Sequence, residues 1–161
     1  MKRRILLCTM ALAGALAIGS RPLQAQVSPG IHVARAADVF GGANGIGASL
    51  QIGFPLMPVD VFVAGEYFFP DCGTDSGCSF AGGSADLHFT MPFPVLTPYA
   101  TAGLVYRRTD GGDTVDPKSD TGFGLGAGVN LGTLVLGAYA EARYEFVDPN
   151  DQLVFRIGIR F

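Results

Sequence analysis

Residues 153–161, LVFRIGIRF, alternate strictly between two kinds of side chain. One set of alternate positions is entirely apolar and ends the chain on an aromatic residue: Leu153, Phe155, Ile157, Ile159 and Phe161. The other set is Val154, Arg156, Gly158 and Arg160. Because successive side chains of a strand point to opposite faces, this stretch predicts a β-strand with one apolar face and one face that carries two arginines.

The first 25 residues have the features of a secretory signal peptide. Lys2, Arg3 and Arg4 precede an apolar stretch, ILLCTMALAGALAIG at 5–19, and a cleavage site follows Ala25. The stretch is shorter than the roughly 20 residues that a membrane-spanning helix needs, so we favour a cleaved signal (1–25) over an uncleaved anchor. The expected mature chain, 26–161, keeps seven basic residues against 14 acidic ones, a net charge of −7. A chain this acidic is a poor candidate for binding nucleic acid.

The mature chain divides into short segments with period-two patterning, separated by Gly, Pro, Asp and Asn. We expect strands at 30–39, 46–54, 59–69, 79–90, 98–108, 121–131, 134–146 and 152–161. Loops are expected at 40–45, 70–78, 109–120 and 147–151, with a two-residue hairpin turn at Gly132-Thr133. Strands of about ten residues match the length that crosses a bilayer at a tilt.

The composition of the two strand faces predicts which one points outward. The polar face consists mostly of Gly, Ser, Ala and Thr with few charges, which suits a cramped interior better than a surface in water. The apolar face therefore points to lipid. Aromatic residues fall at strand ends, as in the girdles at the two membrane interfaces. One expected girdle is Phe40, Tyr67, Phe69, Tyr106, Tyr144 and Phe146, and the other is Phe54, Phe89, Phe93 and Phe161.

The first strand, GIHVARAADV at 30–39, fits this pattern poorly. Either Arg35 faces lipid near mid-membrane, or His32 and Asp38 face outward nearer the interfaces. Because an arginine at the membrane midplane costs about 2–4 kcal/mol and much less at the edges, we expect Arg35 to point inward.

With these strands and the terminal FRIGIRF, the sequence resembles the small outer-membrane β-barrels of Gram-negative bacteria, of the OmpA and OmpX type, in a form that is the barrel alone. The resemblance implies an all-β, eight-stranded, antiparallel up-and-down transmembrane barrel with both termini in the periplasm. It also implies that Phe161, supported by Phe155, Ile157 and Ile159, is the signal read by the outer-membrane assembly machinery. Expected partners are the lipid bilayer and lipopolysaccharide, with a chain that is monomeric.

The last two strands carry enough charge to suggest a register. If paired residue numbers sum to 301, Glu145 lies opposite Arg156 and Glu141 opposite Arg160, whereas Arg143 lies opposite Gly158. A sum of 299 would place Arg143 against Arg156, so we expect the first register. The predicted charge network of the lumen is Glu141, Arg143, Glu145, Arg156 and Arg160.

Other groups of residues offer weaker hypotheses. Cys72 and Cys78, five residues apart in an exported chain, predict a small disulfide rather than a metal site. Asp86, His88 and Thr90 share a face, but no serine at a suitable spacing supplies a nucleophile. The acidic loop containing Asp110, Asp113, Asp116 and Asp120 lacks the spacing of a calcium site, and the glycines at 122–128 lie inside a strand rather than before a nucleotide-binding helix. We therefore expect no enzyme, cofactor or metal.

Eight strands enclose a lumen just wide enough for side chains. We expect Phe62, Glu66, Tyr139 and the predicted charge network to fill it. The leading hypothesis is a non-enzymatic barrel that supports membrane integrity, adhesion or surface contact. A narrow, porin-like channel or small-ligand carrier is the alternative, and a soluble periplasmic barrel of the lipocalin kind is the third.

Overall fold

A computed structural model describes residues 26–37, 42–54, 57–70, 78–91, 93, 96–111, 117–132, 137–149 and 151–161. The expected signal peptide, Phe40 and the tip of the acidic loop lie outside these residues. So does the expected disulfide, because Cys72 and the side chain of Cys78 are not described. No helix among the described residues is long and apolar enough to cross a membrane.

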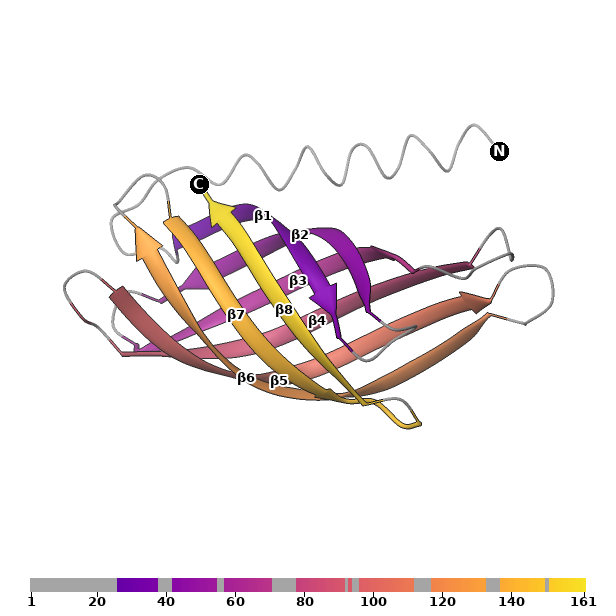
Figure 1. Ribbon diagram of the computed structural model, residues 1–161. Coiled ribbons are helices and arrows are strands. Elements are labelled where there is room, and N and C mark those ends of the chain that lie inside the picture. The colour runs from indigo at the N-terminus through magenta and orange to yellow at the C-terminus, as the bar shows by residue number, and fades with distance from the viewer. Residues whose placement is uncertain are drawn as a thin grey trace, which may run out of the picture.

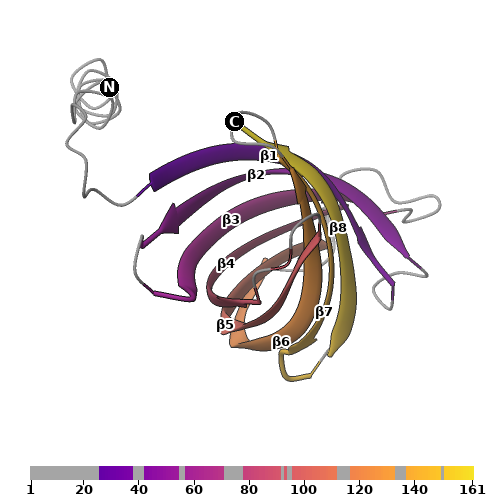
Figure 2. The ribbon, with the colours of Figure 1, turned by 90° about the vertical axis from the view of Figure 1, so that its left-hand side faces the viewer.

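The described chain forms eight antiparallel strands in one closed barrel, in which each strand pairs with its sequence neighbours and β1 pairs with β8 (Figures 1 and 2). The strands are β1 (Gln26–Ala36), β2 (Ala43–Gly53), β3 (Val59–Phe69), β4 (Cys78–Thr90), β5 (Leu96–Gly111), β6 (Lys118–Gly132), β7 (Gly137–Phe146) and β8 (Gln152–Arg160). The predicted up-and-down barrel is confirmed. We call the end where β1 begins and β8 ends the terminal end, and the opposite one the loop end.

The strands are strongly tilted and staggered. Paired residues lead around the barrel from Gln26 through Gly53, Asp60, His88, Thr101, Gly126, Arg143 and Val154, and return to β1 at Ala36. The path comes back ten residues beyond its start. With strands about 4.8 Å apart and a rise of about 3.3 Å per residue, this stagger tilts the strands by roughly 40°.

The faces of the strands divide as their alternation predicts. Large apolar side chains cover the outside, among them Ile31, Val33, Ile46, Val63, Leu87, Leu104, Phe123, Leu125, Phe155, Ile157 and Ile159. Exposed aromatic residues lie toward the loop end (Tyr67, Phe69, Tyr106 and Tyr144) and toward the terminal end (Phe89, Phe93 and Phe161). The inside holds polar, charged and small residues together with a few aromatic rings.

Two predicted registers are wrong. In β7 and β8, Glu141 lies opposite Arg156 and Arg160 opposite Gly137, so paired numbers sum to 297 rather than 301. In β6 and β7 the last pair is Gly132 with Gly137, which replaces the predicted two-residue turn by a connection of four residues, 133–136. In both cases the observed register is shifted from the predicted one by an even number of residues, so every side chain stays on the face that was predicted for it.

The prediction for Arg35 is also wrong. Its side chain points outward and is exposed, while His32 points inward and is buried. Arg35 lies one residue from the end of β1 and donates a hydrogen bond from Nη1 to Asn44 Oδ1 at 3.0 Å. Since β1 begins at Gln26 rather than residue 30, Arg35 is near the loop end of the wall, where an outward arginine costs little.

Candidate functional site: the barrel interior

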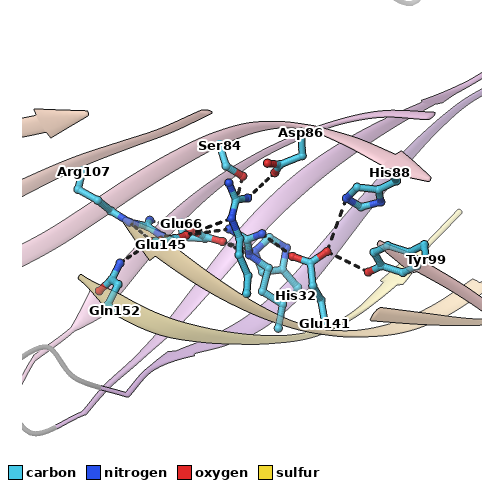
Figure 3. A network of polar contacts seen from close by, with 12 residues as sticks. His32, Glu66, Ser84, Asp86, His88, Tyr99, Arg107, Glu141, Glu145 and Gln152 are labelled. Atoms are coloured by element: carbon cyan, nitrogen blue, oxygen red, sulfur yellow. Dashed lines mark hydrogen bonds and ion pairs between the residues drawn. The ribbon is translucent and has the colours of Figure 1, made fainter. Parts of the chain in front are cut away.

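Charged side chains from β3, β4, β5, β7 and β8 meet inside the barrel. Each comes from an inward-facing alternate position, and all are buried. We call this group the interior network: Glu66, Asp86, Arg107, Glu141, Arg143, Glu145 and Arg156. Figure 3 shows Arg107 beside Glu66 and Glu145, and Glu141 beside His88 and Tyr99.

Arg156 joins carboxylates from opposite sides of the barrel. Its Nε donates to Glu66 Oε1, and its Nη1 lies 2.7 Å from Glu141 Oε1. Its Nη2 donates to Ser84 Oγ at 3.4 Å. Arg156 therefore links β8 to its neighbour β7 and, across the lumen, to β3 and β4.

Arg107 closes the network toward the loop end. Its Nε donates to Glu145 Oε2 at 2.8 Å, and its Nη1 donates to Glu66 Oε2 at 2.9 Å. Arg107 Nη2 also donates to Glu145, and Gln152 Nε2 adds a third donor at 2.6 Å. The guanidinium also lies 5.7 Å and 5.5 Å from the ring centroids of Phe68 and Phe80, within the range of cation–π attraction.

An apolar cluster covers this end of the network. It consists of the buried residues Ala34, Ala36, Ala43, Phe68, Phe80 and Val154. The lumen at the loop end is therefore blocked by packed side chains as well as by ion pairs.

Arg143 and Asp86 form the remaining link. Arg143 Nη1 donates to Asp86 Oδ2, and Arg143 Nε lies 3.7 Å from Glu145 Oε1. Buried charges of this kind are tolerated only when each has opposite charges and hydrogen bonds around it.

A stack of three rings lies on the terminal side of the network. His88 lies between Phe62 and Tyr99, with ring centroids 4.6 Å and 4.5 Å away. Tyr99 donates from its hydroxyl to Glu141 Oε2 at 3.0 Å, and His88 Nε2 lies 3.6 Å from the same oxygen. Tyr99 and His88 thus contact one oxygen of Glu141, Oε2, while Arg156 donates to the other, Oε1; Figure 3 shows His88 and Tyr99 beside Glu141.

The large interior side chains lie over glycines of neighbouring strands. A Cβ at Gly82 would lie 1.5 Å from Arg107 Nη1, and one at Gly124 would lie 2.1 Å from Arg143 Nε. Glycine on the lumen face thus provides the volume that the arginines occupy, as the composition of that face predicts.

All five side chains of the predicted charge network lie in the interior, but with other partners. Glu141 contacts Arg156 rather than Arg160, and Glu145 contacts Arg107 more closely than Arg156. Arg160 lies apart, with Asn130 as its hydrogen-bond partner. The sequence reasoning missed Arg107 altogether and assigned Glu66 and Asp86 no ion pair. For Arg107 the signal existed, because Leu104 and Tyr106 on the apolar face place residue 107 on the inner one.

The side chains considered for catalysis are engaged otherwise. Asp86 is bound to Arg143, and His88 is held between two rings. Within the described parts of the chain, no group of three or more His, Cys, Asp or Glu side chains is arranged to hold a metal ion. The arrangement favours a structural role for the interior.

Comparison with solved structures shows which fold this is. The N-terminal β-barrel domain of OprF from Pseudomonas aeruginosa superposes with a TM-score of 0.64 at 19% identity, covering 86% of this chain and 98% of that one. Neisserial surface protein A gives 0.56 at 20% identity, with coverage of 83% and 94%. Ail, the attachment invasion locus protein of Yersinia pestis, gives 0.57 at 15% identity, with coverage of 85% and 97%. The chain therefore has the fold of the small, OmpA- and OmpX-type outer-membrane barrels.

No protein-family model matches the sequence. No curated protein matches it either.

Proposed function

We propose that the chain is an integral outer-membrane β-barrel without enzymatic activity, whose role is structural or lies in contacts at the cell surface. The observation that carries the proposal is the distribution of side chains across the wall. Leu104 is 70% exposed and Ile157 64% exposed, whereas Arg143 and Arg156 are almost fully buried. A barrel in water has the opposite arrangement, and a barrel in lipid has this one.

The same arrangement argues against the third hypothesis, a soluble carrier. Such a barrel needs an apolar interior with free volume. Here ion pairs and a stack of rings fill the interior, and the apolar residues face out. The exposed apolar outer surface supports contact with the bilayer, and we propose lipopolysaccharide as the lipid of the outer leaflet that it meets.

The blocked lumen makes a wide diffusion pore the weaker alternative. Arg156 and Arg143 cross the middle of the lumen, and the apolar cluster covers the loop end. A conducting state would require the interior ion pairs to separate, which is costly in a low-dielectric interior. Single-channel recording in planar bilayers is the measurement that distinguishes the channel from the structural barrel.

The charges near the loop end bear on the kind of surface partner. Ail of Yersinia pestis has been solved in complex with the heparin analogue sucrose octasulfate. The sequence that joins β1 to β2, β3 to β4, β5 to β6 and β7 to β8, with the adjoining strand ends, carries mainly aspartates: Asp38, Asp71, Asp75, Asp110, Asp113, Asp116, Asp120, Asp148 and Asp151. The basic residues there are Arg35, Arg108 and Lys118. This balance favours a neutral or cationic partner over a sulfated polysaccharide.

The assembly role is proposed for the outward stripe of β8. Phe155, Ile157, Ile159 and Phe161 are all exposed on the outer wall, where a receptor could contact them before the barrel closes. An even number of antiparallel strands brings the start of β1 and the end of β8 to the same, terminal end, which we assign to the periplasm.

Fractionation of cells that express the full precursor tests the proposal. The chain should be found in the outer membrane and should migrate differently on a gel before and after boiling. Deleting Phe161 should abolish both the outer-membrane location and the mobility change on boiling, because the assembly signal is lost. Phe93→Ala is the matched control, since Phe93 is an outward aromatic residue of similar exposure (60% against 58%) outside β8. Recovery of the intact chain as a soluble periplasmic protein would contradict the proposal.

A further inference from the structure

Arg160, the last residue of β8, differs from the other buried arginines. Arg107, Arg143 and Arg156 each contact at least one carboxylate. Arg160 is 8% exposed, yet the ion pairs found among the described residues do not include it. The nearby carboxylates have other partners, because Glu141 is bound by Arg156 and Asp60 by Gln51 at 2.6 Å.

The guanidinium is held in place by contacts that leave one edge free. Nη1 donates to Asn130 Oδ1 at 2.8 Å, and the group lies over the Tyr139 ring, 4.0 Å from its centroid. Nε and Nη2 are buried, and neither has a hydrogen-bond partner within the described part of the chain. These two nitrogens form the edge whose parallel N–H groups bind a carboxylate or phosphate in a bidentate manner.

Two hydroxyl groups with unused hydrogen-bonding capacity belong to neighbouring positions. Ser49 Oγ and Tyr139 Oη are also buried and interact with each other, and neither has a further hydrogen-bond partner among the described residues. Gly30 of β1 pairs with Ser49 on one side and with Arg160 on the other. A Cβ at Gly30 would lie 2.9 Å from Ser49 Oγ and 3.1 Å from Arg160 Cγ, so both side chains close over the same glycine.

An unpartnered, buried guanidinium edge is costly unless water or an anion occupies it. We propose that the terminal end of the lumen contains a binding site for a phosphate-type oxyanion, bound by Nε and Nη2 of Arg160 with the Ser49 and Tyr139 hydroxyls as further donors. Because Arg160 is the last residue of β8 and lies near the rim of the barrel, the ligand can be a soluble phosphate or the phosphate of a lipid headgroup. The site goes beyond the proposed function and does not depend on it.

NMR of the arginine side chains in the folded barrel tests the site. The barrel is prepared in a non-ionic detergent, and phosphate is exchanged for chloride at constant ionic strength. The Arg160 Nε–H resonance should shift saturably with phosphate. Arg160→Lys keeps the charge but loses the bidentate edge, so it should weaken binding by roughly tenfold or more. Arg108→Gln, which removes an exposed arginine near the loop end, should leave binding unchanged, and the gel mobility shift checks that each variant is folded.

The source of the ligand is tested in nanodiscs. A shift in phosphatidylglycerol discs without free phosphate, relative to the barrel in non-ionic detergent and chloride, would assign the site to a lipid headgroup. A shift that requires free phosphate would assign it to a soluble anion. A shift that is not saturable, or that chloride produces equally, would overturn the proposal and assign the unpartnered edge of Arg160 to water.

Discussion

At the scale of single residues, the barrel depends on large and small side chains alternating around the lumen. Arg107 and Arg143 occupy the volume over glycines of neighbouring strands, and they can stay buried only where carboxylates surround them. Gly82 and Gly83 are adjacent in β4, so a Cβ added at Gly82 would lie on the inner face and one added at Gly83 on the outer face. A Cβ at Gly82 would meet the Arg107 guanidinium, whereas the nearest atom for one at Gly83 is Ala64 O at 3.6 Å.

Gly82→Ala should therefore lower the free energy of unfolding by roughly 1–3 kcal/mol through overpacking, because Arg107 must move away from Glu66 and Glu145. Gly83→Ala should be neutral or slightly stabilising, by about 0.5 kcal/mol, because alanine restricts the unfolded chain in both variants but meets no close neighbour at position 83. Urea titration of both variants in lipid vesicles measures the difference. An equal change in the free energy of unfolding for the two variants would contradict this reading, because it would mean that a Cβ at Gly82 does not displace Arg107.

Arg156→Met should lower the free energy of unfolding more than Gly82→Ala does, because it removes a buried ion-pair partner from both Glu141 and Glu66. We expect a loss of about 3–5 kcal/mol, against less than about 0.5 kcal/mol for the exposed Arg108→Met. Adding Glu141→Gln to Arg156→Met should recover part of the loss, since one uncompensated charge is removed. If the double variant is no more stable than the single one in the same urea titration, packing rather than charge explains the effect.

At the scale of strands, the sequence predicts the faces of β2 to β8 but not that of β1, where Arg35 points outward. It predicts the register only up to an even number of residues. Alternation places Tyr144 outside and Arg143 inside in any register that differs by two or four residues. A sum of 301 follows only if charges pair between adjacent strands. In a narrow lumen the partners also come from across the barrel, as Arg156 reaches Glu66 and Arg107 reaches Glu145. The contacts of the interior therefore could not be predicted from β7 and β8 alone, although the network's location could.

Paired cysteines on the outer face test the register. Ala140 lies opposite Ile157 in the structure, whereas a sum of 301 would place it opposite Phe161. In a background without Cys72 and Cys78, Ala140→Cys with Ile157→Cys should form a disulfide on mild oxidation, because paired Cα atoms lie about 5 Å apart. Ala140→Cys with Phe161→Cys should not. Cross-linking of the second pair alone would restore the register with a sum of 301.

At the scale of the whole molecule, one physical choice explains the architecture. Closing eight tilted strands removes every sheet edge, and turning the apolar faces outward leaves an interior that must satisfy its own charges. The outward apolar faces also explain why LVFRIGIRF alternates: its apolar residues lie on the outer wall, and Arg156 and Arg160 lie in the lumen.

The most direct test of this account is the environment of Leu104, in the middle of β5. A fluorophore on Leu104→Cys, in a background without Cys72 and Cys78, is placed in vesicles with brominated lipids or with aqueous iodide. The account predicts quenching by the brominated acyl chains and protection from iodide, with the reverse for a fluorophore on Lys118→Cys near the loop end. Quenching of the Leu104 position by iodide, with no effect of brominated lipid, would contradict the membrane barrel.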